Sequence, residues 1–217
     1  MFVLLVIASI IIGYLLGAIP TSYLVGKYWG RVNLLEQGES HVSATAVYRE
    51  LGWRPFFAVI IGDLLKGMLA VFISQMLVGN VWVVAFTAVA AVTGHCWSVY
   101  IKYRGGLGAT VIFGILFYTG ISFGVKHIPW EYALGAISAI LVMLTTKKSS
   151  LSTIIWLVII STALLIELVA FNDGTLAMVL LPIMLLAIQI VKAKVSHRPD
   201  DAYQNELVSD FKRVKRT

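Results

Sequence analysis

Charged residues and cysteine are scarce in this sequence. Only 13% of the 217 residues are charged, whereas 59% are hydrophobic and the mean hydropathy is +0.88. Soluble globular chains carry about 25% charged residues and about 45–50% apolar residues, so the composition excludes a soluble domain. The single cysteine, Cys96, excludes an intrachain disulfide framework and a thiolate zinc site. The composition therefore predicts an integral membrane protein.

Seven stretches of the chain are candidates for membrane spans. A helical span needs about 20 largely apolar residues to cross roughly 30 Å of hydrocarbon. Seven such spans leave only short loops and a tail, so we expect one all-α, polytopic membrane domain over residues 1–217, with a basic tail from about residue 192. The candidate windows are 2–25, 54–78, 81–99, 110–125, 131–146, 151–171 and 174–191.

The positive charges outside these windows predict the orientation of the bundle. Lysines and arginines gather in residues 26–54, 100–109 and 146–150 and from Lys192 onward, all of which fall on one side if the number of spans is odd. The loops on the opposite side carry only Lys126. By the positive-inside rule the basic side is cytoplasmic, so we expect the N-terminus outside and the C-terminus inside.

Pairs of glycines four residues apart occur in two of the windows. Gly13 with Gly17, and Gly120 with Gly124, fit the small-xxx-small pattern that lets helix backbones approach closely in membranes. We expect these glycines to mark helix contacts within the bundle, with an oligomer interface as the alternative.

A glycine-rich loop directly before the fourth window is a candidate binding site. Gly105, Gly106 and Gly108 lead into a predicted helix N-terminus, where free backbone N–H groups and the helix dipole favour an anion such as phosphate. Arg104 supplies a guanidinium on the approach, and Thr110 supplies a hydroxyl. Loops of this kind also serve simply as turns, and that interpretation stays open.

A second polar segment, residues 38–49, is predicted to face the same compartment. It contributes Arg49 and several hydroxyls, together with His41 and Glu39. Two loops with small residues and one arginine each favour a cleft that binds phosphate. Glu39 and His41 form a candidate acid–base pair only if the loop is extended, because one residue separates them.

Ionisable residues within the apolar windows have structural and functional interpretations. Asp63 and Lys66 are three residues apart, which favours a mutually neutralised structural pair over a proton relay. His95 comes at the end of a window and fits either a packing residue or a site group. The four histidines lie far apart in the sequence, so no histidine metal site is expected.

On these loops the sequence resembles the bacterial acyl-phosphate:glycerol-3-phosphate acyltransferases, the PlsY family. The family's first loop reads Gly-Ser-Gly-Asn-x-Gly-Ala-Thr-Asn-Val-x-Arg, and its second reads Gly-His-x-Phe-Pro-Val-Phe-x-x-Phe-Lys-Gly-Gly-Lys-Gly-Val-Ala-Thr. The resemblance extends from residues 17–22 to His197 in the tail, and residues 63–67 look like a further family element. Positions that match the two loops are Gly38, Ala44, Thr45, Val47, Arg49, Gly94, His95, Val99, Gly105, Gly106, Gly108 and Thr110.

The resemblance implies a seven-helix enzyme of the plasma membrane with its active site on the cytoplasmic side. Such an enzyme transfers an acyl group from acyl phosphate to the 1-hydroxyl of glycerol 3-phosphate, giving lysophosphatidate for phospholipid synthesis. It uses no metal, no cofactor and no acyl-enzyme intermediate, and its partners are the two substrates and membrane lipid, with no nucleic acid. Carried over by position, the catalytic residues are His41, Thr45, Arg49 and His197. The substrate-binding residues are Gly38, Glu39, Ser43, His95, Arg104, Gly105, Gly106, Gly108, Thr110 and Asp200.

Several positions differ from the family where it binds glycerol 3-phosphate. Leu107 replaces a lysine, so a cation is lost, and Glu39 and Asp200 replace neutral residues with carboxylates that repel an anionic acceptor. His41 replaces an asparagine. Two alternatives to the family reaction stay open: a homologue with a changed acceptor, and a non-catalytic membrane protein on the same scaffold. The acyl chain length and the oligomeric state are also left open.

Overall fold

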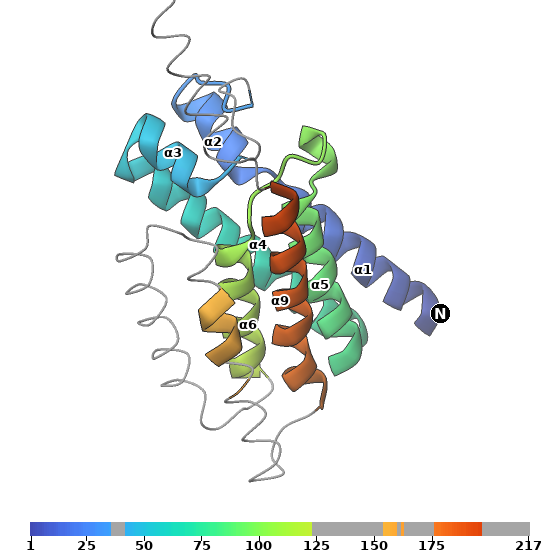
Figure 1. The fold of residues 1–217 in the computed structure, drawn as a ribbon. Coiled ribbons are helices and arrows are strands. Elements are labelled where there is room, and N and C mark those ends of the chain that lie inside the picture. The colour runs from blue at the N-terminus through green and yellow to red at the C-terminus, as the bar shows by residue number, and fades with distance from the viewer. Residues whose placement is uncertain (36–41, 123–153, 160–161, 163–175, 197–217) are drawn as a thin grey trace, which may run out of the picture.

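Long apolar helices run side by side in this protein, and two short helices lie at one end of them (Figure 1). The computed structural model describes residues 1–35, 42–122, 154–159, 162 and 176–196, and residues 154–159 are helical. The all-α prediction is confirmed for these ranges. The further elements are α1 (Phe2–Ala18), α2 (Thr21–Trp29), α3 (Ala44–Leu51), α4 (Trp53–Val78), α5 (Val81–Cys96), the 3-10 helix η1 (Val99–Ile101), α6 (Ala109–Ser122) and α9 (Leu176–Ser196).

The helices agree with most of the predicted membrane spans that the structure describes. Within the described residues, Phe2–Trp29, Trp53–Val78 and Val81–Ile101 are long and apolar enough to cross a membrane, and α6 is apolar but shorter. α9 corresponds to the last window but continues to Ser196. The window 131–146 lies outside the described residues, as does most of 151–171. A total of seven spans therefore stays a prediction.

The first predicted window is interrupted, which corrects the expectation of a single helix over residues 2–25. α1 ends at Ala18 and α2 begins at Thr21, so Ile19 and Pro20 lie between two helices. Proline has no backbone N–H to donate and disfavours a helical conformation in the residue before it. The hydropathy of the window hid this break, because both flanking segments are apolar.

Small residues let α1 pack directly on α5. A Cβ atom added to Gly17 would lie 1.9 Å from the carbonyl oxygen of Ala91, and one added to Gly94 would lie 2.2 Å from that of Tyr14. A Cβ atom on Gly13 would lie 2.5 Å from the side chain of Thr87. The predicted contact within the bundle is confirmed for the first glycine pair. Gly124 of the second pair lies outside the described residues.

The main core lies between α4, α5, α6 and α9, while the outer faces of the helices are apolar as well. On α4, for example, Phe57, Ile61 and Leu65 are all more than half exposed. Large apolar surfaces of this kind mark an interaction surface, here one suited to lipid. Fully buried members of the core include Ala70, Val71, Ala88, Val92, Ile112, Ile115, Leu181 and Leu185.

A smaller core fixes the end of the bundle that carries the polar loops. Val42 and Val47 pack with Val59 of α4 and with Ile101 of η1. The Ser43 side chain accepts a hydrogen bond from the Ala46 amide at 3.2 Å and so caps the N-terminus of α3. This small core holds the segment before α3 against the segment after α5.

Candidate active site

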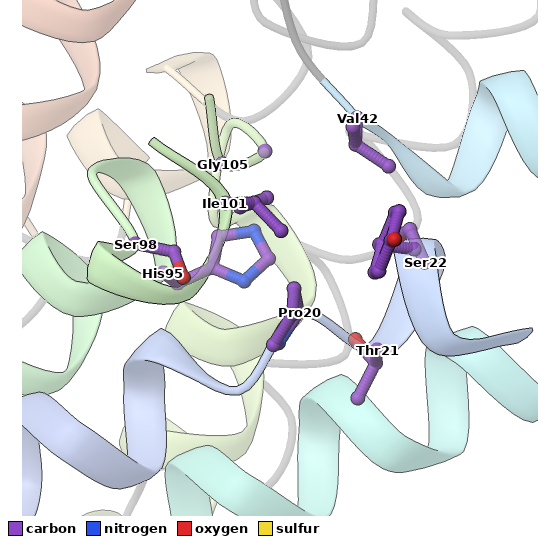
Figure 2. A pocket seen from close by; sticks show the side chains of 10 residues that line it. Pro20, Thr21, Ser22, Val42, His95, Ser98, Ile101 and Gly105 are labelled. Atoms are coloured by element: carbon purple, nitrogen blue, oxygen red, sulfur yellow. The ribbon is translucent and has the colours of Figure 1, made fainter. Parts of the chain in front are cut away.

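An open hollow lies where the break between α1 and α2 meets the loop that follows α5. Its lining comes from three segments far apart in the sequence: the start of α2, the residue before the α3 cap, and the end of α5 with its following loop. Figure 2 shows the His95 imidazole ring near Pro20, Ile101 and Gly105. The lining residues are Pro20, Thr21, Ser22, Tyr23, Val42, His95, Ser98, Ile101, Gly105 and Gly106.

His95 connects the buried part of this site to the glycine loop. Its Nδ1 atom lies 3.8 Å from Oδ1 of Asp63, and its side chain is 10% exposed. On the other side of the ring, Nε2 lies 2.6 Å from the position that a Cβ atom would take on Gly106. One ring nitrogen therefore faces a buried carboxylate, and the other faces the loop.

Asp63 and Lys66 tie α4 to both sides of the break in the first window. Oδ1 of Asp63 lies 2.8 Å from Nζ of Lys66, and both side chains are almost fully buried. The Thr21 hydroxyl donates a hydrogen bond to the same carboxylate, and Lys66 donates to the Ile19 carbonyl oxygen at 2.7 Å. The predicted structural ion pair is confirmed, and it also positions two residues of the hollow, Thr21 and His95.

The glycine loop packs closely on the end of α5. A Cβ atom on Gly105 would lie 1.8 Å from the His95 carbonyl oxygen, so no larger residue fits without movement of the backbone. Gly108 has a φ of +84°, a conformation that favours glycine. α6 begins at Ala109, and the Ile112 amide donates a hydrogen bond to the Gly108 carbonyl oxygen. The predicted arrangement of a glycine loop before a helix N-terminus is confirmed.

The two polar segments meet directly. The Val42 amide donates a hydrogen bond of 3.1 Å to the Arg104 carbonyl oxygen, and Val42 also packs near Ile101 in the smaller core. The described parts of both segments thus lie at one end of the bundle, as the charge pattern predicts.

Only some of the predicted site residues line the hollow. His95, Gly105 and Gly106 do so. Ser43 follows the lining residue Val42 and serves as the α3 cap. Gly108 is buried at the end of the glycine loop, and Thr110 is half-buried in the first turn of α6. The side chains of Thr45, Arg49 and Arg104 are exposed and are not part of the lining. Five predicted residues lie outside the described ranges: Gly38, Glu39, His41, His197 and Asp200.

Four hydroxyl residues of the lining were not predicted from the sequence: Thr21, Ser22, Tyr23 and Ser98. The first two follow Pro20 directly, and a proline within an apolar window is a signal that a helix break exposes polar groups there. The Ser98 hydroxyl donates to the carbonyl oxygen of Ala18, the last residue of α1. No sequence pattern predicts that contact, because it joins residues 80 positions apart.

Lys192 requires a correction. The charge pattern assigned it to the basic tail, but the side chain lies within α9 and is 3% exposed. Its Nζ atom donates a hydrogen bond of 2.7 Å to the carbonyl oxygen of Cys96. The last α9 turns are therefore part of the bundle as far as Ser196.

The described site offers groups that form hydrogen bonds and that favour an anion. No group of three or more histidine, cysteine and acidic residues that could hold a metal ion occurs among the residues that the structure describes. The hollow instead brings an imidazole, several hydroxyls and the glycine loop together. Backbone amides at a helix N-terminus bind anions, and an imidazole and hydroxyls donate and accept hydrogen bonds.

Sequence comparisons connect this chain with a group of lipid-synthesising enzymes. The family model described as "Glycerol-3-phosphate acyltransferase" matches residues 7–200. The chain is 33% identical over 135 residues to a glycerol-3-phosphate acyltransferase of Rubrobacter xylanophilus, a match that covers 61% of this chain and 67% of the relative. It is 38% identical over 164 residues to the enzyme of Geotalea daltonii, with 68% and 82% covered. Other curated glycerol-3-phosphate acyltransferases are matched over 52% to 59% of their own length.

The fold is similar to that of a solved membrane enzyme. The crystal structure of PlsY, an integral membrane glycerol 3-phosphate acyltransferase, in its glycerol 3-phosphate form superimposes with a TM-score of 0.69 at 25% identity. The match covers 94% of this chain and 92% of PlsY.

Proposed function

Because the chain belongs to the glycerol-3-phosphate acyltransferase family, we propose that it is an integral membrane enzyme that acylates glycerol 3-phosphate. In the proposed reaction the 1-hydroxyl oxygen of glycerol 3-phosphate attacks the carbonyl carbon of an acyl phosphate. The bond from that carbon to the phosphate oxygen breaks, the hydroxyl proton ends on the leaving phosphate, and lysophosphatidate and inorganic phosphate are formed. The family match over residues 7–200 and the similarity to PlsY support this assignment.

The observation that carries the proposal is the meeting of the glycine loop and His95 in one hollow. Acyl phosphate is already activated, so the protein needs mainly to hold two anionic substrates close together and aligned. We assign the donor phosphate to the segment Gly105–Thr110, where the first α6 amides have no carbonyl partner within their helix. These amides, with Arg104 assisting, stabilise the charge that develops on the leaving phosphate.

The acceptor is assigned to the opposite wall of the hollow, which Val42 and the start of α2 form. Thr45 and Arg49 lie on α3, within two turns of Val42 along the chain. A guanidinium there supplies a charge-assisted contact for a phosphate group. The proposal completes this wall with His41 and His197 as further catalytic residues.

We further propose that the hollow faces the cytoplasm at the plasma membrane, in a seven-span protein with its N-terminus outside. Support comes from a set of cations on or next to α2, on α3, at the start of α4 and on the loop after α5, and Figure 1 shows these elements at the same end of the bundle. Basic residues beside membrane spans favour the cytoplasmic side. The cations are Lys27, Arg31, Arg49, Arg54, Lys102 and Arg104.

A second candidate is the same acyl transfer to a less anionic acceptor. At position 107 the family that this sequence resembles has a lysine that binds glycerol 3-phosphate, whereas this chain has Leu107, whose carbonyl oxygen is engaged by Gln189 of α9. One charge-assisted hydrogen bond contributes about 1.5–3 kcal/mol, or roughly 10- to 150-fold in affinity. If the acceptor is glycerol 3-phosphate, Leu107→Lys adds a cation and Glu39→Ser removes a carboxylate, so we expect the double variant to be more active toward that acceptor than the wild type.

The experiment that tests the function is a turnover assay on purified protein with palmitoyl phosphate. Phosphate release and lysophosphatidate formation are measured with and without glycerol 3-phosphate, and we expect release that depends on the acceptor. Gly106→Val, which fills the space beside His95, serves as a control that binds no donor. Release only with uncharged or cationic acceptors would favour the second candidate, and no release with any acceptor would favour a non-catalytic protein.

A further inference from the structure

Two polar side chains on the inner face of α9 are buried against the glycine loop. Gln189 is 0% exposed and Lys192 is 3% exposed. They are three residues apart, so they lie on the same face of the helix. Burial of a charge without a partner carries a large free-energy cost, and Lys192 has no ion-pair partner among the described residues. Its Nζ atom instead contacts the end of α5 at Cys96 and the ring of Trp97.

Both side chains donate hydrogen bonds to backbone carbonyl groups at the two edges of the loop. Lys192 donates to the Cys96 oxygen, which lies 2.9 Å from the position that a Cβ atom would take on Gly105. Gln189 donates from Nε2 to the Leu107 oxygen. The lining of the hollow includes Gly105 and Gly106 but neither α9 residue. α9 therefore holds the loop from behind, on the side away from the hollow.

The Lys192 ammonium group also places a positive charge behind the glycine segment of the loop. Residues 105–110 contain no charged side chain. Nζ of Lys192 lies 5.4 Å from the centre of the Trp97 ring, an aromatic face that stabilises a cation in place. In a region with little water, such a charge acts on nearby anions with less screening than it would at the surface.

Gln189 has a feature that fits a positioning role. Its Oε1 atom is buried and has no hydrogen-bond partner in the part of the chain that the structure describes. A buried acceptor without a partner destabilises the fold. The Gln189 amide therefore acts through its Nε2 group, which holds the Leu107 carbonyl group in place.

We propose that Gln189 and Lys192 are positioning residues of the donor site. They hold the backbone from Cys96 to Gly108 in the conformation that binds the donor phosphate, and Lys192 adds positive charge through the loop without touching the substrate. The proposal rests on the proposed function in one respect, the assignment of the donor phosphate to this loop. The α9 contacts themselves do not depend on it.

The test compares substitutions at the two positions with a matched control on the same helix. Lys192→Met removes the charge and keeps an unbranched side chain, while Lys192→Arg keeps the charge. Gln189→Met removes the amide donor. Lys194→Met removes the same charge from an exposed position two residues further along α9 and serves as the control.

Two measurements read the two parts of the proposal separately. The first is the rate at which a water-soluble maleimide labels Cys96, the only cysteine of the chain, whose side chain is fully buried. The second is the dissociation constant of palmitoyl phosphonate, an unreactive analogue of the donor, measured by calorimetry. We expect Lys192→Met and Gln189→Met to accelerate labelling and to weaken phosphonate binding about tenfold, the scale of coupling within one hydrogen-bond network.

Lys192→Arg should restore most of the affinity, Lys194→Met should change neither measurement, and the KM for glycerol 3-phosphate should stay constant. Faster labelling with unchanged phosphonate affinity would overturn the proposal, because α9 would then support only the fold. Unchanged labelling in both variants would overturn it as well. A wild type that binds the phosphonate but forms no lysophosphatidate would refute the proposed function alone, whereas a wild type that does not bind it would refute the donor site.

Discussion

Glycines bring backbones into contact in two regions of this molecule. The two contacts differ in whether they leave backbone hydrogen-bonding groups free to bind a ligand. Gly17 of α1 lies against the Ala91 carbonyl group in the middle of α5, and Gly105 lies equally close to the His95 carbonyl group at the end of α5. In the first region the backbone groups are already bonded within their helices. In the second, the last carbonyls of α5 and the first amides of α6 have no partner within a helix.

The same close approach therefore produces packing in one region and a polar hollow in the other. A glycine pattern by itself predicts only that two backbones meet. The position of the glycines at helix ends is what leaves hydrogen-bonding groups available for a ligand.

The polar side chains near the two regions differ in charge. Between α4 and α5, the hydroxyls of Ser74 and Thr87 form a single neutral hydrogen bond of 3.0 Å. At the site end, among the described residues, three buried charged side chains, Asp63, Lys66 and Lys192, bind one another or backbone carbonyls. Buried charges contribute strongly when they are paired and are costly when one partner is removed.

The largest expected effect comes from breaking the buried ion pair. Lys66→Met leaves the Asp63 carboxylate buried without its partner, and we expect a loss of about 3–5 kcal/mol in the free energy of unfolding. Asp63→Asn together with Lys66→Met should recover part of this loss. The measurement is unfolding in mixed micelles with increasing sodium dodecyl sulfate. Ser74→Ala, which removes a neutral hydrogen bond, is the comparison. If Lys66→Met loses no more free energy of unfolding than Ser74→Ala, the charged pair contributes no more to stability than a neutral hydrogen bond.

The next effect concerns the contact between α1 and α5. Gly17→Val places a branched side chain where a Cβ atom alone would lie 1.9 Å from a carbonyl oxygen. We expect a loss of about 1–3 kcal/mol in the free energy of unfolding through overpacking, with donor affinity unchanged in the folded fraction. Ile11→Val on the exposed face of the same helix is the control. Weaker donor binding in folded Gly17→Val protein would contradict the separation of the two regions.

A smaller effect on stability and a clearer one on binding are expected at the loop. In Gly106→Ala the added methyl group meets the end of the His95 ring at 2.6 Å, and a side chain can move where a backbone cannot. We expect donor affinity to fall by roughly tenfold while the free energy of unfolding falls by less than in Gly17→Val, because the end of a side chain can shift to accommodate one methyl group whereas a backbone carbonyl cannot. The affinity for palmitoyl phosphonate and the detergent titration together check this. Comparable losses in phosphonate affinity and in the free energy of unfolding would mean that the loop serves only to pack the fold together.

No change in activity is expected from the substitutions that test the topology. In a Cys96→Ala background, single cysteines in place of Lys126 and Lys148 should be labelled from opposite sides of the membrane by an impermeant reagent. Both positions lie outside the described residues, so this experiment addresses the seven-span prediction directly. Labelling of both from the same side would contradict it.

The sequence determined the features that depend on local composition. Long apolar windows predicted α4 and α5 closely, because the length of a membrane helix follows from the thickness of the bilayer. The glycine loop before α6 and the contact of α1 through Gly13 and Gly17 were also predictable, since backbone requirements restrict those positions to the smallest residue. The break at Pro20 had a local signal as well, although hydropathy alone concealed it.

Only the tertiary structure decided which polar groups meet. Thr21, Asp63 and His95 belong to three different helices, and Ser98 reaches a carbonyl group 80 positions away. Lys192 has the charge of a tail residue, but the packing of α9 against the end of α5 buries it beneath the glycine loop. Hydropathy and charge are properties of each residue, whereas the partner of a buried polar group depends on how distant helices pack together.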